Sequence, residues 1–254
     1  MRLRFPCMIV ASLCCAASAV SAADVQVLTA GAMKEIVISI KPEFERRTGH
    51  SLIIANDTAG ALARRIAAGE SFDVAVITPA VIADLAAKGK IASGSSVVLA
   101  RVGIGVMVKA GAPQPDISSV DSFKKTLSAA RNVAIIDPQS GGSSGIYLVG
   151  LFDRLGITQQ VMPKAKLKQG GHVADLIVAG EADIGLHQIS EILPVSGVSL
   201  VGPLPAEIQN FTTYAGGVSA STPNAEAARI VLQLLAGPAT DPILKAKGME
   251  RPPS

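Results

Sequence analysis

Short apolar runs alternate with amphipathic stretches along most of this chain. Three of the runs are followed at once by a loop of small and hydroxyl residues and then by a helical pattern. The three strand–loop pairs are 25–28 with 29–32, 52–55 with 56–60, and 133–136 with 137–145. Strands that alternate with helices predict an α/β fold built on mainly parallel sheet.

The remaining apolar pattern completes this alternation. It predicts further strands at 72–77 and 184–186, and helices at 32–47, 61–66, 79–88, 121–129, 173–179, 224–235 and 241–247. Pro42 falls inside the first helical stretch, where it predicts a break or a kink because proline lacks a backbone N–H.

Two apolar segments are longer than the others and contain paired glycines. Segment 97–108 reads as one long strand or as two strands joined by a bend, and segment 211–220 has the same character. Because they bracket a complete α/β unit, they predict two lobes joined by a two-strand hinge: residues 23–100 with 215–254, and residues 101–214. Ligands in such sheets bind beyond the carboxyl ends of the strands, where all three loops fall.

The first residues have the layout of a secretory signal peptide. Arg2 and Arg4 precede an apolar run at 7–20, and small residues end at Ala22, the expected cleavage point. The alternative, a membrane anchor, would need a longer apolar span. We therefore expect export to the periplasm. All three cysteines lie in this segment, so the mature chain would have neither disulfides nor thiolate sites.

Charge and composition narrow the classes of partner. Residues 1–22 carry two arginines and no acid, so 23 basic residues become 21 against 20 acidic ones, and the mature net charge is about +1. That balance, without a clustered basic run, argues against nucleic-acid binding. Scarce aromatics and the absence of Trp argue against sugars and nucleobases, which are usually held by stacking.

The three loops are candidates for binding an anion. Small side chains at a strand-to-helix turn let a ligand reach unpaired N–H groups of the first helical turn, where the helix dipole favours negative charge. Each loop taken alone is better explained as a tight turn, but three copies favour a common cradle. Its candidate residues are Ala30, Gly31, Ala32, Thr58, Ala59, Ser143, Ser144 and Gly145.

Two stretches carry a resemblance to a known family. Residues 61–76, together with Asp137-Pro138, Gly145-Ile146-Tyr147 and Leu155-Gly156, resemble the second- and third-loop motifs of periplasmic molybdate-binding proteins. The resemblance covers nearly all of the mature chain. It implies a type II periplasmic-binding fold, a small anionic ligand held between two closing lobes by hydroxyls, N–H groups and a tyrosine, and the membrane subunits of an ABC importer as partners.

The chain departs from that family at the ligand positions. The first loop has no serine, Thr58 stands where a serine is usual, and Gln188 stands at about the place of the family's tyrosine. An amide and an imidazole, at Gln188 and His187, suit a larger or asymmetric anion such as a carboxylate. Arg64 is either solvated or a partner of a carboxylate or phosphate.

Two hypotheses of function remain open. The first is an exported, monomeric solute-binding protein that captures an oxyanion such as molybdate, or a small organic acid, for an ABC importer. The second is a cofactor-free isomerase of the aconitate isomerase-like branch, in which Arg64, Ser143 and Ser144 hold carboxylates and His187 moves a proton. We expect neither an organic cofactor nor a metal site, since the histidines are scattered along the chain.

Overall fold

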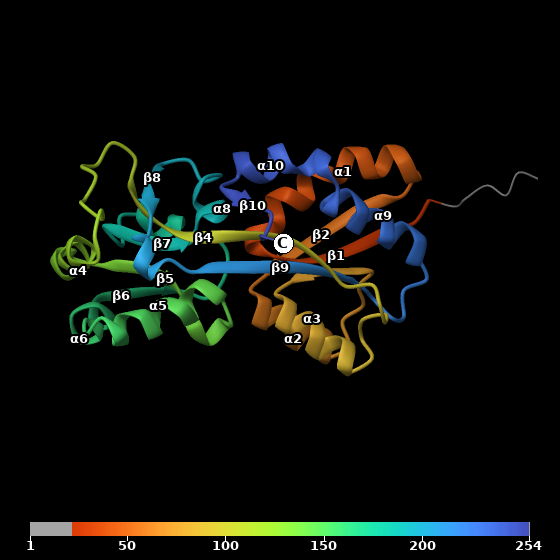
Figure 1. The fold of residues 1–254 in the computed structure, drawn as a ribbon, viewed down its shortest axis with the longest axis horizontal. Coiled ribbons are helices and arrows are strands. Elements are labelled where there is room, and N and C mark those ends of the chain that lie inside the picture. Colours follow the sequence, from red (N-terminus) through yellow and green to blue (C-terminus); the bar gives the residue numbers. More distant parts are fainter. Residues whose placement is uncertain (1–21, 254) are drawn as a thin grey trace, which may run out of the picture.

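The computed structural model describes residues 22–253. A curled mixed β-sheet runs through the length of the molecule, and helices cover it on both sides (Figure 1). The expected α/β class, with helices on both sides of the sheet, is therefore correct. The predicted signal peptide, apart from Ala22, lies outside the described residues.

The first half of the sheet is built around strand β1. It pairs in parallel with β2 on one side and β3 on the other. The strands are β1 (Asp24–Ala30), β2 (Ser51–Asp57) and β3 (Val74–Ile77). The helices of this half are α1 (Lys34–Thr48), α2 (Ala59–Ala67), α3 (Pro79–Ala87), α9 (Ala225–Ala236) and α10 (Asp241–Ala246), and a short 3-10 turn, η1 (Gly31–Met33), precedes α1.

The second half repeats this arrangement around strand β5. It pairs in parallel with β6 and β7. The strands are β5 (Val133–Ile136), β6 (Ala165–Lys168), β7 (Ile184–Gln188) and β8 (Val198–Pro203). The helices are α4 (Val120–Ala129), α5 (Ser143–Arg154), α6 (Thr158–Val161), α7 (Ala174–Val178) and α8 (Ile189–Ile192), with a 3-10 turn, η2 (Pro138–Ser140), before α5.

Two long strands join the halves. β4 (Val97–Lys109) pairs antiparallel with β9 (Phe211–Val218) along its first part and with β7 and β8 along its second part. A two-residue strand, β10 (Met249–Glu250), also pairs with β4. Figure 1 shows β4 and β9 side by side across the middle of the molecule. The alternative of one continuous strand at 97–108 is the correct one.

The hydrophobic core changes over along β4. Val102 packs with the first half's core, around Phe44 and Leu62, whereas Ile104 packs with the second half's core, around Phe152. Gln209 fixes the strand at this changeover: its amide donates to the carbonyl of Ile104 and accepts from the N–H of Ile104, both at 2.9 Å. The exact lobe boundaries stay a prediction.

The expected break at Pro42 does not occur. Helix α1 continues through this residue for 15 residues and ends at Gly49, whose φ of 68° is the left-handed conformation of a C-cap. Proline removes the hydrogen bond to the carbonyl four residues earlier, that of Ile38. Because Ile38 is exposed, solvent can take the free carbonyl, and burial of Phe44 on the opposite face holds the helix against the sheet.

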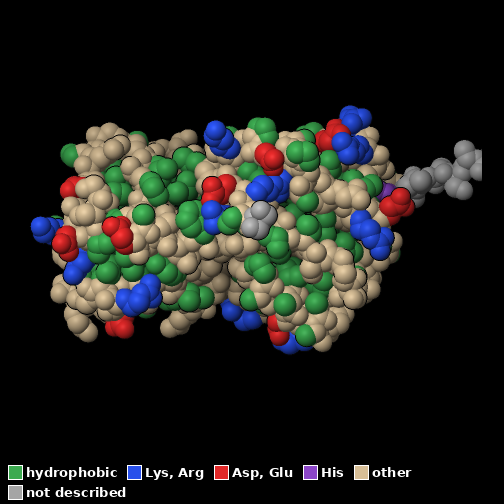
Figure 2. All heavy atoms as spheres, viewed as in Figure 1, with side chains coloured by type: hydrophobic (Ala, Val, Ile, Leu, Met, Phe, Trp, Pro, Cys, Tyr) green, Lys and Arg blue, Asp and Glu red, His purple; other side chains and the backbone are tan. Residues whose placement is uncertain are grey.

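None of the helices within residues 22–253 is long and apolar enough to cross a bilayer. The face drawn in Figure 2 carries scattered Lys, Arg, Asp and Glu side chains and no patch of a single charge. On this face the molecule is hollowed along the lower edge, between the two halves.

Candidate functional site

The main candidate site is a cleft at the carboxyl ends of the parallel strands. It holds about 400 Å³ of empty space, including its open mouth. The loops after β1, β2 and β5 all line it, together with residues from β7, α8 and β9. The lining residues are Ala30, Gly31, Ala32, Asn56, Asp57, Thr58, Ala59, Ile136, Gly142, Ser143, Ser144, Gly171, His187, Gln188, Glu191 and Tyr214.

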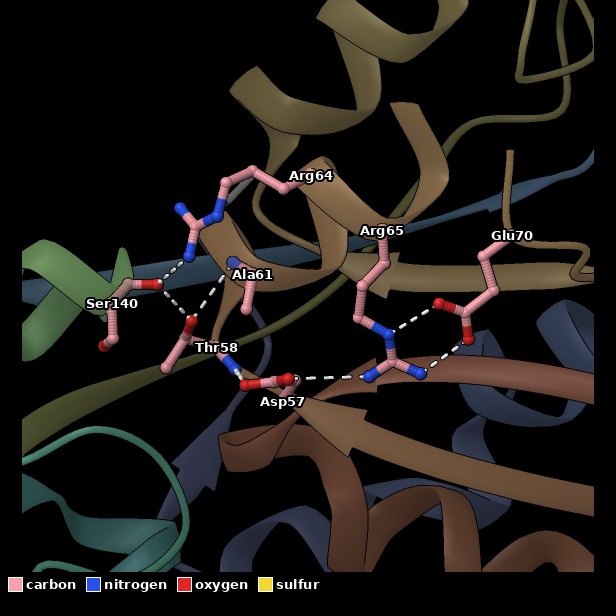
Figure 3. Close-up of polar contacts among 7 residues, drawn as sticks. All are labelled: Asp57, Thr58, Ala61, Arg64, Arg65, Glu70 and Ser140. Atoms are coloured by element: carbon pink, nitrogen blue, oxygen red, sulfur yellow. Dashed lines mark hydrogen bonds and ion pairs between the residues drawn. The ribbon is translucent and has the colours of Figure 1, made fainter. Parts of the chain in front are cut away.

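The loop after β2 is held by its own hydrogen bonds. Asp57 accepts from the N–H of Thr58, and the Thr58 hydroxyl caps α2 by accepting from the N–H of Ala61 (Figure 3). Arg65 lies 3.5 Å from the Asp57 carboxylate and also makes two 2.6 Å hydrogen bonds to Glu70, which raise the pKa of Arg65 and lower that of Glu70. The Asp57 carboxylate at the cleft therefore has one positive partner, which it shares with Glu70.

The loop after β5 leaves donors free. Helix α5 begins at Ser143, after Gly142, without a side-chain cap. A methyl group on Gly145 would lie 2.2 Å from the Ile136 carbonyl, so glycine lets the start of α5 sit against the end of β5. The first N–H groups of α5, with the hydroxyls of Ser143 and Ser144 in the cleft lining, can meet a negative charge there.

Five residues join the two sides of the cleft, and we call them the bridge: Thr58, Gly60, Arg64, Ser140 and Gly141. The Ser140 carbonyl accepts from the Thr58 hydroxyl at 2.5 Å and from the Arg64 guanidinium at 3.1 Å, and both donors converge on it in Figure 3. Beside them, the N–H of Gly60 donates to the Gly141 carbonyl at 3.2 Å. The two glycines touch backbone to backbone: a Cβ on Gly60 would lie 2.7 Å from the Gly141 Cα.

Three buried residues and the nearly buried Glu191 form a second cluster in the cleft, and we call them the inner group: His187, Gln188, Glu191 and Tyr214. The Gln188 amide donates to Thr212 at 2.8 Å and to Ser143 at 3.2 Å. His187 Nε2 lies 3.5 Å from a Glu191 carboxyl oxygen. His187 Nδ1 and Gln188 Oε1 are buried without a hydrogen-bond partner among the described residues. Such atoms are costly unless something else satisfies them.

Burial shifts the titration of the inner group. Loss of solvent lowers the pKa of His187 to about 3, with a further contribution from His172, and raises the pKa of Glu191 to about 8 against the opposing charge of Lys34. Burial and the Glu191 carboxyl also raise the pKa of Tyr214, and a hydrogen bond with Ser143 opposes this shift. At neutral pH the inner group is therefore largely uncharged.

All of the predicted site residues except Arg64 and Gly145 line the cleft. The guanidinium of Arg64 contacts the Ser140 carbonyl, and its contact with a ligand stays a prediction. Glu191 and Tyr214 also line the cleft, although neither is among the residues predicted from the sequence. The four-residue spacing of His187 and Glu191 was the available signal for the first, and the position of Tyr214 in a long apolar strand was the signal for the second.

The lining contains no Lys or Arg. Within residues 22–253, no three His, Cys, Asp or Glu side chains are placed to hold a metal ion. An anion in this cleft would be met by neutral donors: hydroxyls and the N–H groups at the start of α5.

Comparison with known proteins identifies the family. Residues 25–250 match the family model described as bacterial extracellular solute-binding protein. The chain belongs to this family. This solute-binding protein is also 33% identical, over an alignment of 261 positions covering 99% of the chain and 98% of the relative, to a protein named aconitate isomerase from a Pseudomonas species.

Solved structures show that the fold of this solute-binding protein is shared with several binding proteins. The periplasmic molybdate-binding protein of Azotobacter vinelandii superposes with a TM-score of 0.75 at 20% identity, covering 90% of this chain and all of that one. The sulfate-binding protein of Mycobacterium tuberculosis gives a TM-score of 0.71 at 16% identity, covering 90% of this chain and 87% of that one.

Proposed function

We propose that this solute-binding protein captures a small organic acid with two or three carboxylates in the cleft, in the periplasm, and delivers it to an ABC importer. The observation that carries the choice of ligand is the Glu191 carboxyl beside the Ser143, Ser144 and Tyr214 hydroxyls of the lining. A compact oxyanion such as molybdate carries its whole charge in one place, so it cannot hold that charge away from Glu191, which repels it whenever the carboxyl is ionised. An organic acid can place one carboxylate at the start of α5 and another part beside Glu191.

The names of the neighbours support an anion as the ligand. The chain shares its fold with proteins named for molybdate and sulfate binding, and it shares full-length sequence similarity with one named for a tricarboxylate. An uncapped helix start together with the Ser143, Ser144 and Tyr214 hydroxyls suits a carboxylate, because each of its oxygens accepts hydrogen bonds.

Calorimetry tests this proposal. The purified protein is titrated with trans-aconitate, cis-aconitate and citrate, and in parallel with molybdate, tungstate and sulfate. We expect heat and saturation with at least one of the carboxylates and weaker or no binding of the oxyanions. Tighter binding of molybdate than of any carboxylate would contradict the choice of an organic acid.

A second candidate function is isomerisation of a tricarboxylate such as aconitate. The buried His187–Glu191 pair in the cleft favours it, and so does the relative named aconitate isomerase. The lowered pKa of His187 makes this residue a weak base, whereas a carboxyl with a pKa of about 8 can give and take a proton near neutral pH. Within this candidate, Glu191 replaces His187 as the acid–base group.

A single acid–base group is sufficient for this isomerisation. Ionised Glu191 takes a proton from the methylene carbon next to a carboxylate, and the electron pair spreads over the allylic system. Glu191 then returns the proton to the carbon at the other end, so the double bond has moved with no net change in protons. The N–H groups at the start of α5 would stabilise the charge that develops on the carboxylate.

Proton NMR separates the two candidates. The protein is incubated with trans-aconitate in deuterated buffer, and the appearance of cis-aconitate and of deuterium at the allylic carbons is followed. An isomerase gives turnover in the wild type and in Glu207→Gln, which removes an exposed carboxylate outside the lining, but not in Glu191→Gln. Binding without turnover leaves capture for transport as the function.

A further inference from the structure

Glu191 holds an unusual position in the cleft. It belongs to a single helical turn, α8, that directly follows β7, and its side chain is only 12% exposed. A Cβ on Gly31, in the first loop, would lie 2.3 Å from a Glu191 carboxyl oxygen. The carboxyl thus reaches across to the opposite loop, and Gly31 leaves the space that it occupies.

The groups that face Glu191 do not compensate a negative charge. His187 of β7 is the nearest titratable neighbour, at 3.5 Å, and it is buried as a neutral imidazole. Tyr214 of β9 is buried and neutral, and His172 approaches only the Glu191 backbone carbonyl, at 3.1 Å. Lys34 of α1 supplies the one opposing charge, from outside the cleft lining.

Asp57, the other carboxylate of the lining, shows the contrast. Its charge is met by Arg65 and by the N–H of Thr58. Glu191 has no Arg or Lys within 4 Å among the described residues. An anion bound in the cleft would therefore meet an uncompensated charge if Glu191 were ionised.

We propose that ligand binding is coupled to protonation of Glu191, so that the cleft accepts its anion only when this carboxyl is neutral and donates a hydrogen bond to it. The inference rests on the proposed function, because it concerns the same anion in the same cleft. It adds that the ligand atom beside Glu191 must be a hydrogen-bond acceptor and that affinity depends on pH.

Ligand affinity should fall as the pH rises, because binding favours the protonated form of Glu191. Burial raises the pKa of free Glu191 to about 8, and a bound anion raises it further. Below pH 7 the carboxyl is already neutral, and affinity is constant. Above pH 8 a proton must be taken up with each ligand, and affinity falls by up to about tenfold per pH unit.

The proton count is measured by calorimetry with trans-aconitate at pH 8, in buffers with different heats of ionisation. We expect uptake of about half a proton per ligand, since half of the free carboxyls are ionised there. Glu191→Gln should reduce the uptake to near zero and make affinity independent of pH between 7 and 9, whereas Glu207→Gln should behave like the wild type.

The calorimetry distinguishes failure of the role given to Glu191 from failure of the proposed ligand class. Saturable binding with no proton uptake in the wild type overturns the role of Glu191 and leaves the proposed function intact, whether or not the variant folds. No heat with trans-aconitate, cis-aconitate or citrate overturns the proposed ligand class, and the proton count is then taken with molybdate. No heat with any of these anions overturns both proposals.

Discussion

The bridge and the inner group both connect elements from the two halves, but they treat their polar atoms in opposite ways. In the bridge, the Ser140 carbonyl has two donors, and the Gly60 N–H has an acceptor. In the inner group, His187 Nδ1 and Gln188 Oε1 have no partner within the described chain, and Glu191 has no Arg or Lys within 4 Å there. Satisfied polar atoms stabilise a conformation, whereas buried unsatisfied ones are costly until a water or a ligand supplies the missing partner.

Residues that occupy similar positions in the sequence therefore have different roles in the two clusters. Thr58 and Ser143 both stand at the start of a helix after a strand. Thr58 uses its hydroxyl to cap α2 and to contact Ser140, so it is occupied. Ser143 does not cap its helix: its hydroxyl contacts Gln188 and Tyr214 and lines the cleft, where an anion can reach it.

The largest effect is expected from breaking the bridge at its closest contact. Gly60→Ala places a methyl group 2.7 Å from the Gly141 backbone, which cannot move aside as a flexible side chain would. Overpacking of this kind costs about 3 kcal/mol, so ligand affinity should fall by roughly a hundredfold as the two sides of the cleft lose this contact. Calorimetry measures the change.

The matched control for that variant is Gly150→Ala, in helix α5. A Cβ there would lie 3.5 Å from Arg154, an ordinary contact. We expect unchanged affinity and slightly higher stability, because alanine favours a helix over glycine by about 1 kcal/mol. Equal affinity losses in both variants would contradict the role given to the bridge.

A smaller loss of ligand affinity is expected when a hydroxyl is removed from the start of α5. Ser143→Ala removes a hydroxyl at the start of α5 that can donate to the ligand. A hydrogen bond to a charged group contributes about 1.5 kcal/mol or more, so affinity should fall by roughly tenfold. Ser128→Ala, at an exposed position of α4, is the control and should bind as the wild type does.

Arg64→Ala sharpens the distinction between bridge and ligand contacts. If Arg64 acts only in the bridge, Thr58 and Gly60 still hold the second half, and affinity falls by about threefold to fivefold, which corresponds to one hydrogen bond. A loss near a hundredfold, seen for carboxylates and not for other anions, would instead place Arg64 in direct contact with the ligand.

The smallest effect is expected on stability as a function of pH, because two shifts in the inner group oppose each other. His187 binds protons more weakly in the folded state, so stability rises from pH 3 to 6.5. Glu191 binds its proton more tightly in the folded state, so stability falls from pH 4.5 to 8. The melting temperature should be level between pH 4.5 and 6.5 and decline by a few degrees up to pH 8.

Thermal melts of Glu191→Gln test this assignment. The variant should keep the rise below pH 4.5 and continue to gain stability up to pH 6.5, with no decline above that pH. A decline that persists unchanged in the variant would assign it to other groups.

The sequence alone determined the fold class and three sides of the cleft. Alternating apolar runs gave the strands and helices, since each buries one face at its own period. Small residues after β1, β2 and β5 marked the loops, because parallel strands end at one edge of a sheet. These features are local, because each depends on residues that are neighbours in the sequence.

Only the tertiary structure decided which polar groups are free. Arg64 looks like an anion partner in the sequence, but the fold brings the Ser140 carbonyl, 76 positions away, within reach of it. Glu191 and Tyr214 carry only weak local signs of a site, and they meet because β7 and β9 both flank β4. The pKa of a carboxyl depends on its burial and on neighbours far along the chain. Neither can be inferred from the residues next to it in the sequence.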